Sequence, residues 1–229
     1  SMPTDCISFR DTNYFSSLIC DYLDENEQIK PFYNRYPRLV NFKAQIDEKK
    51  ASYKTSNRTV LVNALKTQYK TLDVSKLTNQ NIASLEKENT FTITTGHQLN
   101  LFTGPLYFFY KIIDTINICK KLTSKYPQHN FIPVYWMASE DHDYKEIKFF
   151  NSNNTLFDWH ISTKGTVGDL ETQSLTKVFD KLVNCFGTEN INSKNLIDLF
   201  NKSYLKNKKL SDATFNLVHN LFGKHGLLI

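Results

Sequence analysis

Two short polar segments hold the side chains best suited to chemistry. Residues 140–143 read Glu-Asp-His-Asp and follow the apolar run 131–138 after Ser139, while residues 96–98 read Gly-His-Gln and follow the β-branched run 91–95. Ionisable groups placed directly after an apolar strand are poor packing residues, because burying a charge without a partner is costly. Both segments are therefore predicted to form a site.

The segment 140–143 suits proton transfer. His142 could act as a general base or acid near neutral pH, or polarise a carboxylate, and Asp141 or Asp143 could orient it or bind a substrate amine. A second interpretation is a cap for the following helix, which acidic residues also favour. A third interpretation is a metal site in which His97 joins Asp141, His142 and Asp143. Their spacing matches no standard metal motif, so no metal is predicted.

The segment 96–98 suits binding. Gly96 allows a sharp turn or a close approach to a ligand. A helix is predicted to open at residues 103–105, with Thr103 as its cap and Pro105 in its first turn, and its free N–H groups could hold a phosphate or carboxylate. Lys111 is either exposed on this helix or within reach of the anion. The sequence has neither G-x-G-x-x-G nor a P-loop, which disfavours ordinary dinucleotide or P-loop binding.

A strand–helix–strand unit is predicted to position both segments. The first strand spans 91–95 and ends at Gly96, and a loop of 97–102 follows. The helix buries a face of apolar residues and ends before Pro127, and the second strand spans 131–138. Such a unit indicates parallel strands in a doubly wound α/β sheet, where ligands bind beyond the carboxyl ends of strands. If the strands are neighbours, the two segments face one crevice. The residues of the predicted helix face are Phe109, Ile112, Ile113, Ile116, Cys119 and Leu122.

The chain is predicted to fall into four parts. Residues 1–87 are predicted to be mainly helical, including a helix with Phe15, Leu18, Ile19 and Leu23 on one face. Residues 88–150 form the α/β core, 151–210 an insertion of short elements, and 211–229 a return to the core through a helix capped by Ser211. Residues 226–229 resemble the opening of another buried strand, which suggests a fragment of a longer protein.

Composition excludes several classes of protein. The 229 residues carry a formal charge of +5, but their lysines form no concentrated stripe, so we expect no nucleic-acid partner. No signal peptide or membrane span is predicted, and we expect a cytoplasmic protein. The four cysteines are widely spaced and are expected to be reduced, with Cys119 buried.

The stretches 95–107 and 133–143, with Glu146 following, resemble the signature of the bacillithiol biosynthesis cysteine-adding enzymes. The resemblance is firm over about residues 90–150. It implies a Rossmann-like, nucleotidyltransferase-like core interrupted by connecting-peptide insertions, here 151–210. It also implies a C-terminal coiled coil that forms a homodimer, which this chain lacks.

The resemblance further implies a reaction, in which cysteine is added to glucosaminyl-malate in the last step of bacillithiol synthesis. ATP, with Mg²⁺ accompanying it, is the expected co-substrate, although no residues for it are predicted. Two departures affect the site: many members of the family have Gln in place of His97, and Gly near Asn100. The predicted catalytic residues are Asp141, His142 and Asp143; the predicted substrate-binding residues are Gly96, His97, Gln98, Asn100, Thr103, Gly104, Trp136 and Glu140.

Three other functions remain open from the sequence. One is a nucleotidyltransferase or synthetase acting on another small acid, which the same helix-start anion site would serve. Another is a non-catalytic module that binds a small molecule. The third is a metal-dependent hydrolase. Binding of glucosaminyl-malate and metal analysis would separate them.

Overall fold

The computed structural model describes residues 5–102, 104, 106–162 and 164–229. The chain divides into two compact units, one ending at Tyr53 and the other beginning at Lys54. The predicted domain boundaries at 87, 150 and 210 stay a prediction. No helix in the described part of the chain is long and apolar enough to cross a membrane.

The first unit is helical, as predicted, but its first helix does not bury the predicted face. Ser16 caps this helix by accepting a hydrogen bond from the Ile19 amide. Cys20 is its buried residue, whereas the predicted face, with Leu18 as its most exposed member, lies open. A helix of seven residues offers only two turns for packing. Within residues 5–53 the Phe9 ring meets Phe15 of this face with the centroids 4.7 Å apart, yet the side chains of the face stay at least 37% exposed. The elements are α1 (Ser17–Leu23), η1 (Glu27–Phe32), η2 (Leu39–Asn41) and α2 (Phe42–Ser52).

The second unit contains the predicted α/β core. Its elements up to the second strand are α3 (Thr55–Tyr69), α4 (Lys76–Ser84), β1 (Thr90–Gln98), α5 (Tyr107–Lys125) and β2 (Asn130–Ala138). The elements that follow are α6 (Tyr144–Ile147), β3 (Phe149–Ser152), β4 (Thr155–Asp158), η3 (Val167–Asp169), η4 (Thr172–Leu175), α7 (Thr176–Phe186), α8 (Ile191–Phe200), η5 (Asn201–Leu205), α9 (Leu210–Phe222) and η6 (Gly223–His225).

The two predicted strands are parallel neighbours. Their register runs from Thr90 opposite Asn130 to Gln98 opposite Ala138. Leu228 adds a parallel bridge to Val134 on the other side of β2, with the Tyr135 amide donating to the Leu228 carbonyl at 2.8 Å. The predicted parallel pair is therefore confirmed, and residue 228 lies beside it as the sequence suggested.

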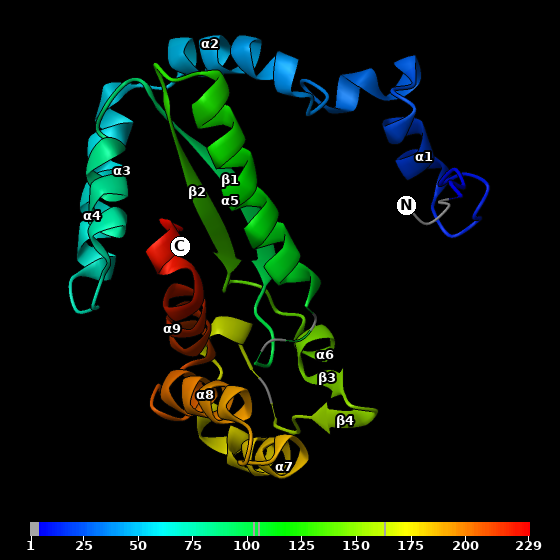
Figure 1. Cartoon of the computed structure of the whole chain (residues 1–229), viewed down its shortest axis with the longest axis vertical. Coiled ribbons are helices and arrows are strands. Elements are labelled where there is room, and N and C mark those ends of the chain that lie inside the picture. The colour runs from blue at the N-terminus through cyan, green and yellow to red at the C-terminus, as the bar shows by residue number, and fades with distance from the viewer. Residues whose placement is uncertain (1–4, 103, 105, 163) are drawn as a thin grey trace. The chain divides into compact units, whose positions relative to one another are not determined.

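Helices cover both faces of this pair (Figure 1). On one face, Phe108, Ile112 and Ile116 of α5 pack with Tyr135 of β2. On the other face, α3 and α4 supply apolar side chains that pack against Ile132 and Leu228. Helix α5 buries Phe108 and Thr115 and leaves Ile113 exposed, so its buried face is rotated slightly from the predicted one. The arrangement is the layered α/β core that the sequence predicted.

Three predicted element boundaries are wrong. Strand β1 continues through Gln98, because residues 96–98 pair with 136–138 of the longer partner strand. Helix α5 begins at Tyr107, after Gly104, and has no side-chain cap; Thr103 and Pro105 lie outside the described residues. Helix α9 begins at Leu210, so Ser211 lies inside it and is not its cap.

The segment after β2 builds a separate apolar core beyond the carboxyl ends of the strands. Figure 1 shows α6, β3, β4, α7 and α8 gathered below the arrowheads of β1 and β2. Their buried aromatic residues, such as Phe157, Trp159 and Phe179, pack with Leu99, Leu101 and Phe102 from the loop after β1. The insertion therefore anchors the loop that follows the first strand.

Arg58 of α3 secures the entrance to β1. Its guanidinium is buried and donates hydrogen bonds to the carbonyls of Leu85 and Thr90, both at 3.0 Å. A longer bond of 3.4 Å reaches the Glu88 carbonyl. Arginine's several N–H donors suit this group of carbonyls, which would otherwise be buried without partners.

We predict that Arg58→Met lowers the free energy of unfolding by about 3 kcal/mol, because buried carbonyls lose their donor. Urea denaturation of the variant and of wild type measures the difference. Lys87→Met, which removes an exposed cation nearby, should change the midpoint little. Equal stability of Arg58→Met and wild type would show that the guanidinium does not hold the strand entrance.

Candidate active site

Gly96 continues the strand and does not turn the chain. A Cβ added at Gly96 would lie 3.8 Å from the nearest atoms, which belong to Trp136. That is ordinary van der Waals contact, and Gly96 is not among the residues with positive φ. The predicted turn at this glycine is therefore wrong, because the parallel partner keeps the backbone extended.

The His97 imidazole lies among aromatic rings. It stacks on Phe108 with the centroids 5.6 Å apart and meets Tyr107 edge-on at 4.9 Å. Burial, with a smaller effect of the Lys111 charge, lowers the pKa of His97. The neutral imidazole is therefore favoured, and it can donate one N–H and accept one hydrogen bond.

Lys111 reaches back from α5 to the end of β1. Its ammonium donates a hydrogen bond to the Gly96 carbonyl and lies 5.9 Å from the Tyr107 ring centroid. The ammonium therefore lies at the end of β1, and its contact with an anion stays a prediction. The spacing of Lys111 along the helix was the only available signal, and spacing alone could not show which way the side chain turns.

The two polar segments meet through Gln98 and Asp141. The Gln98 amide donates to Asp141 Oδ2 at 2.8 Å, and Asp141 Oδ1 accepts the Asp143 backbone N–H at 3.0 Å. The Asp143 N–H, followed by the Gln98 amide, holds the pKa of Asp141 below its usual value. The predicted crevice between the two strand ends thus has a direct hydrogen bond across it.

The other members of 140–143 have different surroundings. Asp143 is the N-cap of the short helix α6 and accepts the Glu146 amide at 3.3 Å, as the capping interpretation proposed. Glu140 and His142 are exposed, and within the described part of the chain no hydrogen bond is made by the His142 ring. A substrate could therefore reach His142 without displacing a protein partner.

A turn from the insertion holds the backbone of this segment. The Val167 amide donates to the Asp141 carbonyl at 2.7 Å, and the Gly168 amide donates to the Ser139 carbonyl at 2.9 Å. A Cβ on Gly168 would lie 2.6 Å from the Ser139 oxygen, so only glycine fits this approach. No local pattern predicts this contact, because it joins residues far apart in the chain.

Tyr204 holds the loop after β1. Its buried hydroxyl lies 2.9 Å from the Asn100 carbonyl and 3.1 Å from the Phe102 carbonyl, between which its proton is shared. Phe102 adopts a φ of 52°, which is uncommon for a residue other than glycine. Asn100 is buried and donates to the Gln98 carbonyl, so it shapes the turn. No local sequence pattern indicates this role of Tyr204.

The remaining predicted residues are spread around the sheet end. Trp136 is 62% exposed and, with Thr92, Thr94 and Glu140, lines a hollow of about 530 Å³ between α3 and the sheet. Gly104 lies before α5, and a Cβ there would come within 2.6 Å of Phe150, so this glycine permits close packing and does not open the helix. Thr103 lies outside the described residues.

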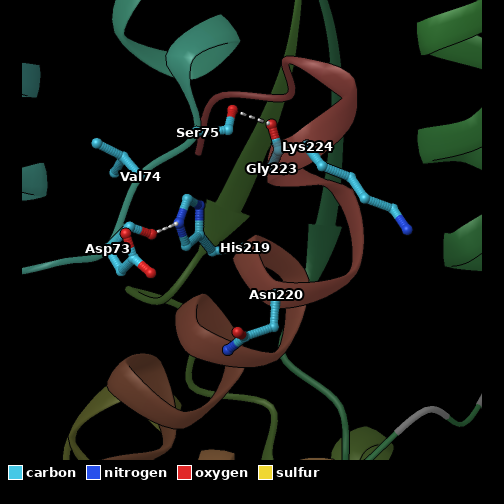
Figure 2. A pocket seen from close by; sticks show the side chains of 7 residues that line it. All are labelled: Asp73, Val74, Ser75, His219, Asn220, Gly223 and Lys224. Carbon is cyan, nitrogen blue, oxygen red and sulfur yellow. Dashed lines mark hydrogen bonds between the residues drawn. The ribbon is translucent and has the colours of Figure 1, made fainter.

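A smaller hollow of about 240 Å³ lies at the other end of α9 (Figure 2). His219 Nε2 lies 3.0 Å from the Asp73 carbonyl, and the Ser75 hydroxyl donates to the Gly223 carbonyl at 3.2 Å. Figure 2 shows both bonds joining the segment before α4 to the end of α9. These hydrogen bonds connect the segment before α4 to the end of α9. None of these residues belongs to the site at the strand ends.

The described residues contain no group of three or more His, Cys, Asp or Glu side chains arranged to hold a metal ion. The four cysteines all lie in the described part and are free thiols. Cys119 is buried, as predicted, and burial raises the pKa of its thiol to about 12.

We predict that Gln98→Leu raises the pKa of Asp141, because the carboxylate loses a donor that favours its ionised form. The pKa should stay below its usual value, since the Asp143 N–H remains. Carbon-13 NMR of the Asp141 carboxyl group across a pH titration measures the change, with Gln128→Leu, at an exposed position, as the control. An unchanged Asp141 pKa would show that the two segments do not interact.

Comparison with known proteins agrees with the resemblance noted from the motifs. The family model described as "Bacillithiol biosynthesis BshC, N-terminal Rossmann-like domain" matches residues 2–229. Relatives named "Putative cysteine ligase BshC" include one from Flavobacterium psychrophilum, 52% identical over 229 residues, and one from Flavobacterium johnsoniae, 52% identical over 228. Each alignment covers 100% of this chain and 43% of the relative. A relative from Cytophaga hutchinsonii with the same name is 38% identical over 97% of this chain and 40% of its own length.

The chain thus spans less than half the length of these relatives, and the match falls on the part described as Rossmann-like. The layered core, the parallel strands and the motifs at their ends are all features of this same part. The chain belongs to the BshC family of bacillithiol biosynthesis, and it corresponds to the N-terminal Rossmann-like domain of that family.

Proposed function

We propose that this chain is the site-bearing part of an enzyme that joins L-cysteine to glucosaminyl-malate, the last step of bacillithiol biosynthesis. The names of the relatives support a cysteine ligase. The observation that carries the proposal is the bond between Gln98 and Asp141, because it unites the two motif segments at one strand edge. The chain covers 43% of those relatives, so the activity is proposed for the longer protein.

The reaction forms an amide. The sugar amine would attack the activated carboxyl carbon of cysteine and form a C–N bond. The C–O bond to the activating group would break, phosphate or AMP would leave with that oxygen, and the amine would lose a proton. A carboxylate is a poor electrophile, so we expect ATP, accompanied by Mg²⁺, to supply the activation of this carboxyl group. We also expect the longer protein to form a homodimer through a C-terminal coiled coil.

Our proposed roles follow from where the side chains lie. His142 is exposed beside a carboxylate that is fixed in place, so we assign it the proton lost by the attacking amine. Asp141 is already bonded to Gln98 and to the Asp143 N–H, and its negative charge would stabilise a nearby imidazolium. Residues 96–98 would bind the malate carboxylates.

The assignment is tested by mass spectrometry of the longer protein incubated with glucosaminyl-malate, cysteine and ATP. We expect bacillithiol with ATP and none without it. Product in the absence of ATP would point to an already activated cysteine donor. A folded protein that yields no product under any condition would contradict the ligase proposal and favour another acid substrate or a binding role.

We predict that His142→Ala in the longer protein lowers kcat by about 100-fold, the lower end of the usual contribution of a general base. KM for cysteine should change little, because His142 handles the proton and not the binding. His225→Ala, which removes another exposed histidine, is the control and should retain wild-type turnover. Turnover of His142→Ala equal to that of the control would exclude the proposed role.

A further inference from the structure

We propose that Lys111 and His97 form a subsite for an oxyanion, either a carboxylate or a phosphate group of a substrate. Neither residue is assigned this role by the family description or by the names of the relatives. The subsite deepens the proposed function and rests on it for its biological meaning. Its binding chemistry can nevertheless be tested without any turnover.

The first observation is the position of the Lys111 ammonium. The side chain runs from α5 to the end of β1, and a hydrogen bond to the Gly96 carbonyl holds its ammonium there. An ammonium has three N–H donors, and this carbonyl accepts one of them. A cation with donors to spare is thus fixed beside the last residues of the strand, where ligands bind in sheets of this kind.

The second observation is the charge around Lys111. Lys43 and Lys209 pair with Asp47 and Asp169, but among the described residues no carboxylate lies within 4.0 Å of the Lys111 ammonium. Its recorded neighbours are a carbonyl and the Tyr107 ring. Within the described part of the chain, Lys111 therefore forms no ion pair, and its ammonium can bind an anion directly.

The third observation is the adjacent imidazole. His97 is half-buried against Phe108 and Tyr107, and the Tyr135 hydroxyl donates to its carbonyl at 3.3 Å. Two phenols also lie near this residue: the Tyr107 ring meets the imidazole, and the Tyr135 hydroxyl binds the His97 carbonyl. Among the described residues, Lys111 is the one whose charge lowers the pKa of the ring. Aromatic walls exclude water on one side, which strengthens an ion pair formed there.

These features make anion binding and His97 protonation mutually dependent. Lys111 disfavours a proton on His97, and an anion held between them would favour one. Anion binding should therefore raise the pKa of His97, and the dissociation constant should fall as the pH falls through that pKa. A lysine that only satisfies the Gly96 carbonyl would produce no such coupling.

The test is proton NMR of the His97 ring in this chain, titrated with pH while L-malate or inorganic phosphate is added at constant ionic strength. The His97 signal is identified by its loss in His97→Gln. We expect a saturable rise of roughly one unit in the His97 pKa, equivalent to about tenfold tighter anion binding to the protonated form. Saturation by malate alone would identify a carboxylate subsite, and saturation by phosphate alone would identify a phosphoryl subsite.

Variants separate this role from a purely structural one. Lys111→Met and Lys111→Gln should each raise the His97 pKa without ligand and weaken anion binding at least tenfold, and glutamine can still donate to Gly96. Lys120→Met, which removes an exposed lysine further along α5, should behave as wild type. No saturable effect of either anion, or unchanged binding in both Lys111 variants, would overturn the proposal. Anion binding by a longer protein that makes no bacillithiol would leave the subsite standing and remove the proposed reaction.

Discussion

The parallel pairing of β1 with β2 is the constraint on which the site depends. Its register places Gln98 opposite Ala138, so that Asp141 comes within hydrogen-bonding distance of the Gln98 amide. Side chains on a strand alternate between its faces. A slip of one residue would turn Gln98 toward α5 and His97 away from it. Arg58 at the entrance of β1 and the helices on both faces maintain the register that brings the two segments together.

The segment after β2 supports both loops that leave the strand ends. Its aromatic core encloses Phe102, whose left-handed backbone conformation would be unfavourable without tight packing and the hydrogen bond from Tyr204. Its turn at Gly168 binds the backbone of the 139–141 segment. Both loops that leave the strand ends are therefore held by a part of the chain that supplies none of the proposed catalytic groups. Such support keeps functional side chains in place without occupying them.

Sequence patterns predicted the α/β core because local signals were strong. The β-branched run at 91–95, the continuous apolar run at 131–138 and the periodic apolar face of the helix between them are each recognisable from a short stretch of sequence. The end of β1 was misplaced, because its extension through Gln98 depends on pairing with a partner strand and not on Gly96 itself. The predicted start of α5 is too early, because the helix begins at Tyr107. Gly104, which precedes it, allows close packing against Phe150, and no local pattern reveals that contact.

The site was predictable in outline and not in its contacts. The meeting of the 96–98 and 140–143 segments followed from the carboxyl-end rule for parallel strands. Asp143 caps α6, as the capping interpretation expects, and its catalytic role stays a prediction. Tyr204 and Gly168 could not be found, because their contacts join residues distant in sequence and leave no local periodicity.

The central claim is that the two strand ends form one site in solution. Nuclear Overhauser spectroscopy of the labelled chain tests it most directly, through the side-chain amide protons of Gln98 and the β protons of Asp141. The 2.8 Å bond between these side chains predicts a clear cross-peak that is retained at neutral pH. Assigned signals without that cross-peak, in a chain that still shows the β1–β2 backbone contacts, would contradict the account.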